Sequence, residues 1–492
     1  MHRAIGMELA VPGVMHDPTS PAPVAGQAAA SAARPVSSSV SSSVTRDWAC
    51  PFCPLLCDDI EAHVADDATI TAPATDCPRL AAALTHYGSA DLNCPPSIDG
   101  QAVTLDTALA EAADILSHAH RPLFGACATD VAGARALYTL AAACGATLDT
   151  LHGDALSAAT LAMQDRGAFF TTLSEVRSRA DLLVVFGCAP AQHHPRFYER
   201  ALAGNGDGDS ASVAASATAT APRTICFVGC PVDPAAPPIA DARCESILAD
   251  ASPHDLLALW SAIAEGRPAS VFEKGMPQTA QLATQLATLM ERIAAARYTA
   301  FIYEPAALPQ PHAALLIEAL HRIVKAINRT SRAGALALGG ADGALTVSQT
   351  VTWLSGLPLR THVSRPDRPE GAAPLDHDPY RYRAERLLDA REVDALLWVT
   401  SFAPHALPAA LDPQAPAIVF GPPSLASTIS PRAARTVFIP VATPGIDSDG
   451  HLFRLDTSIV TPLHAARQTN LRTVAALATD LAERVADARR PT

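Results

Sequence analysis

The chain has 492 residues, of which 49% are hydrophobic and 17% charged, and its formal net charge is −13. A chain of this length is too long for one simple core and predicts two or three globular domains. The acidic balance argues against nucleic acid or an anionic membrane surface as a partner, because phosphate groups need a basic face. No run of about 18 apolar residues occurs, so no membrane-spanning helix is expected.

Two segments of low complexity flank or interrupt the globular sequence. Residues 1–46 are rich in Ala, Ser and Pro, lack the sustained apolar run of a signal peptide, and are expected to form a disordered tail. Residues 204–221, GNGDGDSASVAASATATA, are expected to be a flexible surface insertion.

The most specific chemical pattern is C-x2-C-x3-C-x19-C, which is formed by Cys50, Cys53, Cys57 and Cys77. Three closely spaced thiolates can hold one face of a [4Fe–4S] cluster, and a fourth can close it. Zinc also accepts four cysteines, although its sites more often pair two C-x2-C motifs, and unliganded thiols are the third interpretation. Eleven cysteines, an odd number, do not suggest a disulfide framework, so a reducing cytoplasm is expected.

Most of the remaining sequence alternates between helical and strand patterns. Apolar residues recur at helical spacing in 105–116, behind Thr104 as N-cap, and again in 311–327. Short continuous apolar runs ending in Gly, Pro or a turn predict buried parallel strands. These runs are 181–187, 224–229, 299–305, 395–402, 417–421 and 436–442. The pattern predicts an α/β protein with two open sheets behind a small cysteine-rich region.

Two loops follow predicted strands at their carboxyl ends, where open α/β sheets bind ligands. The loop FGCAPAQHHPR carries Cys188, His193, His194 and Arg196. It is either a cofactor or partner loop, or a loop whose histidines bond only to backbone. The glycine-rich loop at 338–343 precedes a predicted helix, but its spacing matches neither G-x-G-x-x-G nor a Walker A motif.

Several ordered segments together resemble the B subunit of formylmethanofuran dehydrogenase, in the molybdopterin oxidoreductase superfamily. The resemblance runs from Trp48 to His464 and rests on CPFCPLLCDDI, PSIDGQAVTLDTALAEAADIL, LSEVRSRADLLVVFGCAPAQHHPR, TVTWLSGLP with VSRP, and IPVATPGIDSDGHLFRLD. It implies a [4Fe–4S] subdomain followed by two α/β domains that clasp a bis-pterin molybdenum or tungsten centre.

The resemblance also implies a domain organisation. The cysteine-rich subdomain takes 47–100, one α/β domain takes 101–149 with 365–465, and the other takes 150–364. Residues 466–492 are expected to form a C-terminal helix in place of the barrel-like pterin-binding domain that many members carry.

Site residues follow from the same resemblance. Catalytic members place a metal-ligating cysteine in a Cys-His-Gly stretch, and here Leu151 precedes His152 and Gly153. Because an alkyl side chain cannot replace a thiolate donor, Leu151 argues against a bound molybdopterin or tungstopterin. His152 and Arg365 would be the catalytic groups if the chain were active. Arg79 matches a position between cluster and pterin, and Cys188 and His194 are the candidate cofactor-binding residues of their loop.

The implied function is in one-carbon metabolism. With the metal ligand absent, the chain most resembles the B subunit of the bacterial formyltransferase/hydrolase complex, which converts formyl-tetrahydromethanopterin to formate. Its expected role is a redox-inactive scaffold beside an amidohydrolase-like A subunit, a C subunit and a formyltransferase D subunit. The cysteines would then either brace the N-terminal region around a cluster or be empty. The alternatives are an active molybdenum or tungsten formylmethanofuran dehydrogenase subunit and a metal-binding module outside one-carbon metabolism.

Overall fold

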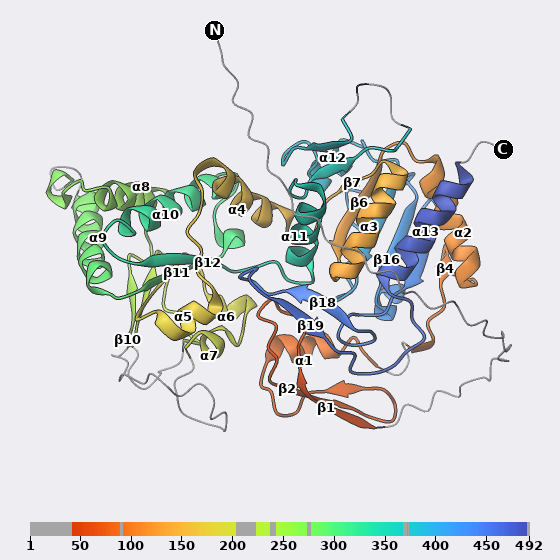
Figure 1. Ribbon diagram of the computed structural model, residues 1–492, viewed down its shortest axis with the longest axis horizontal. Coiled ribbons are helices and arrows are strands. Elements are labelled where there is room, and N and C mark those ends of the chain that lie inside the picture. The colour runs from red at the N-terminus through yellow and green to blue at the C-terminus, as the bar shows by residue number, and fades with distance from the viewer. Residues whose placement is uncertain are drawn as a thin grey trace, which may run out of the picture. The chain divides into compact units, whose positions relative to one another are not determined.

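The computed structural model describes residues 42–88, 92–202, 223–236, 243–272, 277–367, 371 and 373–489. These residues form two large open sheets flanked by helices, a small antiparallel sheet and a two-stranded ribbon (Figure 1). The predicted insertion at 204–221 lies outside the described residues, as does 1–41 of the predicted tail. Every helix in the described part of the chain is too short or too polar to cross a bilayer.

The cysteine-rich region is built on a three-stranded antiparallel sheet and one helix. Its elements are β1 (Ser43–Trp48), β2 (Ile60–Val64), β3 (Ile70–Thr71) and α1 (Pro78–Leu84). Ser43 pairs with Val64 in the β1–β2 ladder, so the prediction that 43–46 belong to a disordered tail was wrong. Trp48 is buried, and its Nε1–H donates to the carbonyl of Gly445 at 2.8 Å, which ties β1 to the far end of the chain.

The smaller of the two large sheets has five parallel strands in the order β10-β9-β8-β11-β12. The strands are β8 (Leu182–Phe186), β9 (Thr224–Val228), β10 (Arg243–Ile247), β11 (Thr299–Tyr303) and β12 (Ala333–Ala337). The helical elements of this region are α4 (Gly153–Arg166), α5 (Leu173–Arg179), α6 (Pro190–His193), α7 (Phe197–Leu202), α8 (Pro253–Ala264), η2 (Ala269–Val271), α9 (Pro277–Ala295), η3 (Pro305–Ala307) and α10 (Ala313–Ile327). The chain leaves β8 and β11 in opposite directions across the sheet, so their carboxyl ends flank a crevice.

The larger sheet has nine strands in the order β14-β13-β7-β6-β15-β16-β17-β4-β5. The strands are β4 (Ser97–Ile98), β5 (Gln101–Ala102), β6 (Pro122–Ala128), β7 (Thr147–Leu148), β13 (Thr361–Val363), β14 (Leu375–His377), β15 (Ala395–Thr400), β16 (Ala417–Gly421) and β17 (Thr436–Pro440). The helical elements are α2 (Leu105–His118), α3 (Val131–Cys144), α11 (Ala344–Ser355), α12 (Ala384–Asp389), η4 (Pro423–Thr428) and α13 (Val474–Ala488). The central strands β6, β15, β16 and β17 are parallel, and antiparallel pairs close both edges.

Two expected domain boundaries differ from the structure. Strand β4 belongs to the larger sheet although 47–100 was expected to be cysteine-rich subdomain. Helix α11 packs on α3 and β6, and β13 pairs with β7, although both were expected in the 150–364 domain. Gly343 explains the position of α11: it has φ +78°, and a Cβ there would lie 2.4 Å from the carbonyl oxygen of Thr129, so only glycine permits this approach.

A ribbon of β18 (Gly450–Phe453) and β19 (Val460–Leu463) touches all three parts of the described chain. Leu455 N–H donates to the carbonyl of Pro54 in the cysteine-rich region at 2.8 Å. Asp456 accepts a hydrogen bond from the N–H of Leu173, at the start of α5, at 2.9 Å. Phe453 N–H donates to the hydroxyl of Thr346 on α11 at 2.9 Å. The ribbon therefore holds the two large sheets and the cysteine-rich region in one arrangement.

The predicted secondary structure is confirmed where the apolar pattern was strongest. All six predicted strands exist, as β8, β9, β11, β15, β16 and β17. The helices predicted at 105–116 and 311–327 are α2 and α10, the helix predicted after the glycine-rich loop is α11, and α13 lies within the predicted C-terminal helix. Thr104 caps α2 by accepting the N–H of Thr107 at 3.2 Å. The predicted α/β class with open sheets is confirmed as well.

Candidate functional site

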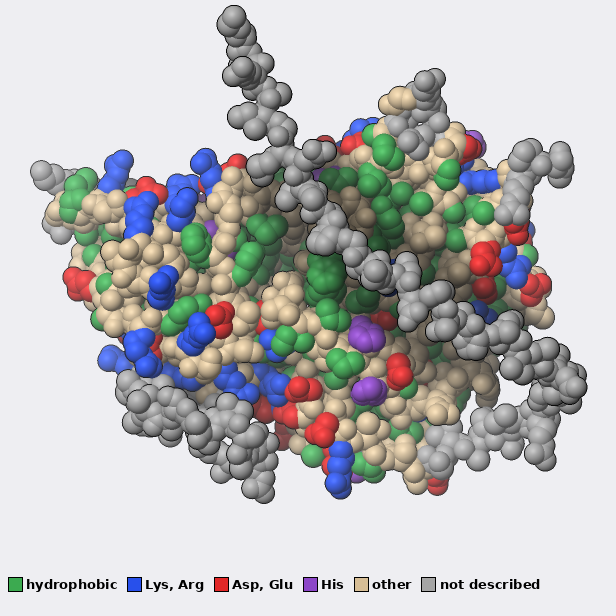
Figure 2. All heavy atoms as spheres, viewed as in Figure 1, with side chains coloured by type: hydrophobic (Ala, Val, Ile, Leu, Met, Phe, Trp, Pro, Cys, Tyr) green, Lys and Arg blue, Asp and Glu red, His purple; other side chains and the backbone are tan. Residues whose placement is uncertain are grey.

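A cavity of about 660 Å³ lies where loops from the carboxyl ends of both large sheets meet. The loops after β8, β11, β12 and β15 contribute to its wall, together with α1 and the first turns of α4. Figure 2 shows this face hollowed between the positions of α4 and α11, with hydrophobic side chains on both sides of the hollow. Carboxyl ends of strands are where such folds bind ligands, so this cavity is the candidate site.

One polar wall of the cavity joins an arginine, an aspartate and a histidine. Asp342 Oδ1 lies 3.5 Å from Arg79 Nη2, and Asp342 Oδ2 lies 3.1 Å from His405 Nε2. Asp342 is almost fully buried, so these two partners stabilise its negative charge more than water does.

A second polar pair in the wall joins a histidine to a glutamate. His193 Nδ1 lies 2.8 Å from Oε1 of Glu304, which directly follows β11 and is buried. Arg79 Nη1 donates to the carbonyl of His193 at 3.3 Å, so the two polar groups are connected.

His152 enters the cavity from the N-cap of α4 in a left-handed conformation, with φ +56° and ψ +26°. This region is sparsely populated by residues other than glycine and costs roughly 1 kcal/mol. Burial lowers the pKa of His152, while the charge of Asp342 opposes that shift. The imidazole is therefore held neutral beside a carboxylate, as a proton acceptor or hydrogen-bonding group would be.

His194 is 2% exposed, and its Nδ1 has no hydrogen-bond partner among the described residues. Burial, together with the positive charge of Arg79, lowers its pKa to about 3. A buried nitrogen without a partner is costly, so an unsatisfied group on the cavity wall is a position where a bound molecule or water would be stabilised.

The buried histidines predict a loss of stability in acid. Burial lowers the pKa of His194 to about 3 and that of His321, on α10, to about 4, from an unfolded value of 6.5. Below pH 6.5 these histidines become protonated in the unfolded chain but stay neutral in the folded protein. The free energy of unfolding is therefore highest above pH 6.5 and decreases as the pH falls. We expect a loss of up to about 2 kcal/mol per histidine between pH 6.5 and 5.

Urea denaturation across this pH range measures the effect. His194→Gln should remove its share of the slope, whereas His118→Gln, at a histidine 79% exposed, should leave the slope unchanged. An equal slope in both variants would show that burial of His194 does not set the pH dependence.

Arg79 connects the cavity to the cysteine loop. Its Nε–H donates to the carbonyl of Phe52 at 2.6 Å, and its charge acts to lower the pKa of Cys53. Arg79 therefore contacts both the cysteine loop and the cavity wall, and its expected position between a cluster and a pterin remains a prediction.

The four cysteines of the motif lie close enough for their charges to interact. Cys50 N–H donates to the carbonyl of Cys57 at 2.9 Å, which closes the 50–57 loop and brings its three thiols together. Burial raises the pKa of Cys50 well above its usual range, and the charges of Cys53, Cys57 and Cys77 would raise it further. Burial likewise raises the pKa of Cys53 to about 12 and that of Cys57 to about 11.

The surroundings of the four cysteines are compatible with a bound anionic group. All four thiols are free of disulfides, and Arg79, Arg196 and Arg200 provide positive charge beside Cys53 and Cys57. Among the described residues, no three His, Cys, Asp or Glu side chains converge as the ligands of one ion would. The [4Fe–4S] cluster and the zinc site therefore both remain predictions for these four cysteines.

Leu151 occupies the place where the resemblance implies a metal-ligating thiolate. Its N–H donates to the carbonyl of Ala126 at 2.9 Å, and its side chain packs against an apolar cluster that includes Trp398 and Leu387. Leu151 is not among the residues that line the cavity. The residues present therefore do not fit a pterin-bound metal with a protein thiolate ligand.

Two further predicted site residues lie outside the cavity. Cys188 lines a neighbouring cavity of about 400 Å³ that shares His193 and Glu304 with the main one. Arg365 pairs with Asp367 at 3.4 Å and packs beside Gly145, so the structure does not bring it together with His152. The arginine beside the first turn of α4 is instead Arg360.

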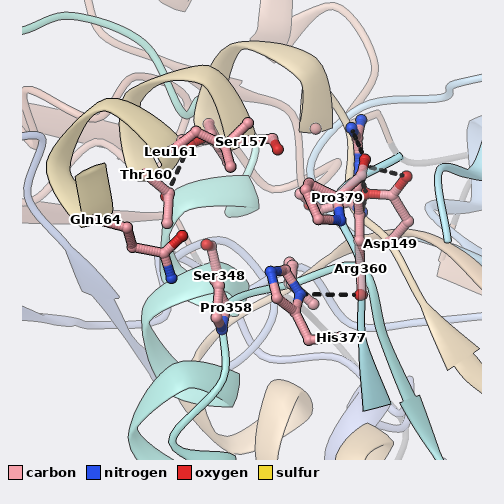
Figure 3. Close-up of a pocket in the computed structure, with 14 residues that line it drawn as sticks. Asp149, Ser157, Thr160, Leu161, Gln164, Ser348, Pro358, Arg360, His377 and Pro379 are labelled. Carbon is pink, nitrogen blue, oxygen red and sulfur yellow. Dashed lines mark hydrogen bonds and ion pairs between the residues drawn. The ribbon is translucent and has the colours of Figure 1, made fainter. Parts of the chain in front are cut away.

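Arg360 belongs to a small pocket behind the main cavity, with room for about one water molecule (Figure 3). It is buried and contacts Asp149 at 3.4 Å and Asp154, in the first turn of α4, at 2.5 Å. The pocket shares Leu156, Thr160 and Ser348 with the main cavity. Arg360 therefore fixes the start of α4 and, through it, the position of His152.

The sequence reasoning did not name Glu304, Asp342 and His405 as site residues. Glu304 and His405 follow strands β11 and β15, and Asp342 lies within the glycine-rich loop after β12, so their positions at the carboxyl ends of strands are the signal that would have found them.

Comparisons with known proteins support the resemblance inferred from the sequence. No family model matches the chain. The B subunit of the formyltransferase/hydrolase complex Fhc of Methylorubrum extorquens is 27% identical over 304 residues, which cover 62% of this chain and 74% of that protein. The B subunit of a tungsten-containing formylmethanofuran dehydrogenase 2 is 34% identical in Methanocaldococcus jannaschii and 30% in Methanococcus maripaludis. In both, the match covers 168 residues, 32% of this chain and 38% of the relative.

A solved structure gives the same fold. A chain of the X-ray crystal structure of the formyltransferase/hydrolase complex (FhcABCD) from Methylorubrum extorquens, in complex with methylofuran, superposes with a TM-score of 0.62 at 24% identity. The superposition covers 80% of this chain and 99% of that chain. The predicted similarity to B subunits of both kinds is thus confirmed, and the α/β fold with it.

Proposed function

We propose that this chain, a relative of formylmethanofuran dehydrogenase and formyltransferase/hydrolase B subunits, is the B-type subunit of a formyltransferase/hydrolase complex. In that complex, which transfers a formyl group from a tetrahydromethanopterin carrier and releases formate, the chain performs no redox step of its own. Its partners would be an amidohydrolase-like A subunit, a C subunit and a formyltransferase D subunit, in the cytoplasm. The match to nearly the full length of a chain in a solved FhcABCD complex supports this assembly.

The observation that carries the proposal is Leu151. A redox centre of this superfamily needs a soft donor at this place, and Leu151 instead is partly buried against an apolar cluster. Loss of the ligand together with retention of the fold favours a scaffold that shapes the cavity and the surfaces around it.

The polar wall of the cavity gives that scaffold a chemical role. Arg79 supplies a guanidinium, which suits a carboxylate ligand, and His152 is held neutral and close to Asp342. A small polar molecule would be bound and oriented here by hydrogen bonds, with no electron transfer at the site.

The cysteine motif is proposed to hold a [4Fe–4S] cluster with a structural task. Ligands that bind only the folded state add directly to its stability. The cluster would brace the loop of residues 50–57, which carries the backbone carbonyl that Arg79 contacts.

Metal analysis of the chain, purified anaerobically with its native partners, tests this proposal. We expect about four iron atoms per chain, with molybdenum and tungsten at background. Cys57→Ser should lose iron, whereas Cys144→Ser, at a buried cysteine of α3 outside the motif, should retain it. Molybdenum or tungsten near one per chain, with pterin, would overturn the redox-inactive role.

The second candidate is an active molybdenum or tungsten formylmethanofuran dehydrogenase subunit. The retained cavity of about 660 Å³ and the position of His152 in its wall favour it, as does the similarity to the tungsten-containing enzymes. The same metal analysis separates the two functions.

A further inference from the structure

Cys188 and Cys230 occupy equivalent positions at the carboxyl ends of two neighbouring parallel strands. Phe186 of β8 pairs with Val228 of β9 in the last register of this ladder, and Gly187 N–H donates to the carbonyl of Val228 at 3.0 Å. The next residue of each strand is a glycine with positive φ, +60° at Gly187 and +68° at Gly229. A cysteine follows each glycine: Cys188 follows Gly187, and Cys230 follows Gly229.

The two thiols share one environment. Both side chains are buried in the same hydrophobic cluster, at 6% and 7% exposure. Burial raises the pKa of both thiols, and a charge on Cys230 would raise the pKa of Cys188 further. The backbone amides of Gly187 and Cys188 lie within hydrogen-bonding reach of the Cys230 sulfur and oppose the rise of its pKa. Both cysteines are free of a disulfide, and the Cys230 thiol lies 3.8 Å from the carbonyl oxygen of Val185.

A neighbouring cavity gives small molecules a route to the pair. This cavity, about 400 Å³, is lined by both cysteines and by His193, Asp233 and Glu304. The cysteines of the 50–57 loop are not among its lining residues, so the two sets of thiols face different spaces.

From this juxtaposition we propose that Cys188 and Cys230 are a reversible dithiol, converted to a disulfide by a small-molecule disulfide such as oxidised glutathione. Neighbouring strands lie about 4.8 Å apart, within the Cα separation that a disulfide requires. The proposal does not depend on the proposed function, because the two thiols belong neither to the cysteine motif nor to the lining of the main cavity.

The reaction proceeds by two thiol–disulfide exchanges. The sulfur of one cysteine, after losing its proton, attacks the small disulfide, whose S–S bond breaks to release the first small thiol. The second cysteine then attacks the mixed disulfide, forms the intramolecular S–S bond and releases the second small thiol. The two protons leave on the small thiols, the cysteines are oxidised by two electrons, and the reagent is reduced by two.

Closure of this bond would act on the candidate site. Cys188 directly precedes the turn that leads into α6, which ends at His193, the partner of Glu304. The bond would tie the start of this loop to the end of β9. Oxidation would therefore restrict the loop that carries His193 and His194 into the main cavity.

The test uses the full chain under anaerobic conditions with a series of glutathione redox buffers. Free thiols are trapped by alkylation after acid quench, and peptides are mapped without reduction. We expect the loss of two free thiols per chain, a linked peptide pair joining Cys188 to Cys230, and recovery with dithiothreitol. Hydrogen exchange of residues 187–196 should be slower in the oxidised protein.

Variants make the result specific. Cys188→Ser and Cys230→Ser should each abolish the linked pair and stop at a mixed disulfide with glutathione. Cys226→Ser, at a cysteine of β9 in the core of the opposite sheet face, should still form the link. If the unmodified protein kept both thiols reduced in oxidised glutathione, or closed Cys188 onto another cysteine, the proposal would be overturned without recourse to any variant.

Discussion

Replacing Arg467 with methionine is expected to lower the free energy of unfolding by about 3–5 kcal/mol. Arg467 and Asp447 form an ion pair, 2.8 Å between Nε and Oδ1, in which both side chains are fully buried. Arg467 also donates to the carbonyl of Ala68 at 2.9 Å and lies over the ring of Tyr87. The variant would leave the Asp447 carboxylate in the interior without its charged partner, which is the costly way to break a buried pair.

Two controls separate the lost charge pair from the lost side chain. The double variant with Asp447→Leu should recover a large part of the stability, because no buried charge is left uncompensated. Arg472→Met removes a pair with Asp480 at 3.1 Å that is about half exposed, and it should cost less than about 1 kcal/mol. Urea denaturation at neutral pH measures all three variants, and similar losses for Arg467→Met and Arg472→Met would contradict the expected role of the buried pair.

Arg360→Met is the second large effect expected, again about 3–5 kcal/mol. Asp149 is almost fully buried, where desolvation raises its pKa and Arg360 opposes that rise. Without Arg360 the carboxyl group must either protonate or remain buried as an unpaired charge. Asp154 would also lose its contact with Arg360, so the first turn of α4 should exchange its amide hydrogens faster than in the unmodified protein.

Arg383 provides the matched control. It also pairs with Asp154, at 2.7 Å, but it is 41% exposed. Arg383→Met should therefore cost less than about 1 kcal/mol and leave hydrogen exchange in α4 nearly unchanged. Equal acceleration of exchange in the two variants would mean that the buried contact of Arg360 with Asp149 does not fix the start of α4.

The strands could be predicted from sequence because both faces of each are buried. Runs such as 182–186 and 395–400 are apolar at nearly every position and buried throughout, a pattern that few other elements share. The strand order could not be predicted in this way, because it depends on pairings between segments far apart in the chain. Helix α11 illustrates this limit: its sequence predicts a helix but contains no signal for the sheet on which it packs.

The residues of the candidate site were likewise only partly predictable from the sequence. The loop of His193 and His194 was found from its position after a strand, and it does line the cavity. Arg365 was chosen by its place in a motif, yet the structure brings Arg360, five residues earlier, to the start of α4. Which of two nearby arginines reaches a helix depends on the path of the loop, and that path is not encoded in the motif itself.

The contacts of Trp48 and Arg467 have a consequence for the order in which the protein is made. The cysteine-rich region is synthesised early, but Trp48 donates to Gly445, and Ala68 accepts from Arg467, 399 residues later. Until those late residues leave the ribosome, the region lacks the partners that bury its indole and satisfy its carbonyl. The cysteine loop also needs late residues, because its Pro54 carbonyl accepts from Leu455, so this region cannot complete its packing until almost the whole chain has been made.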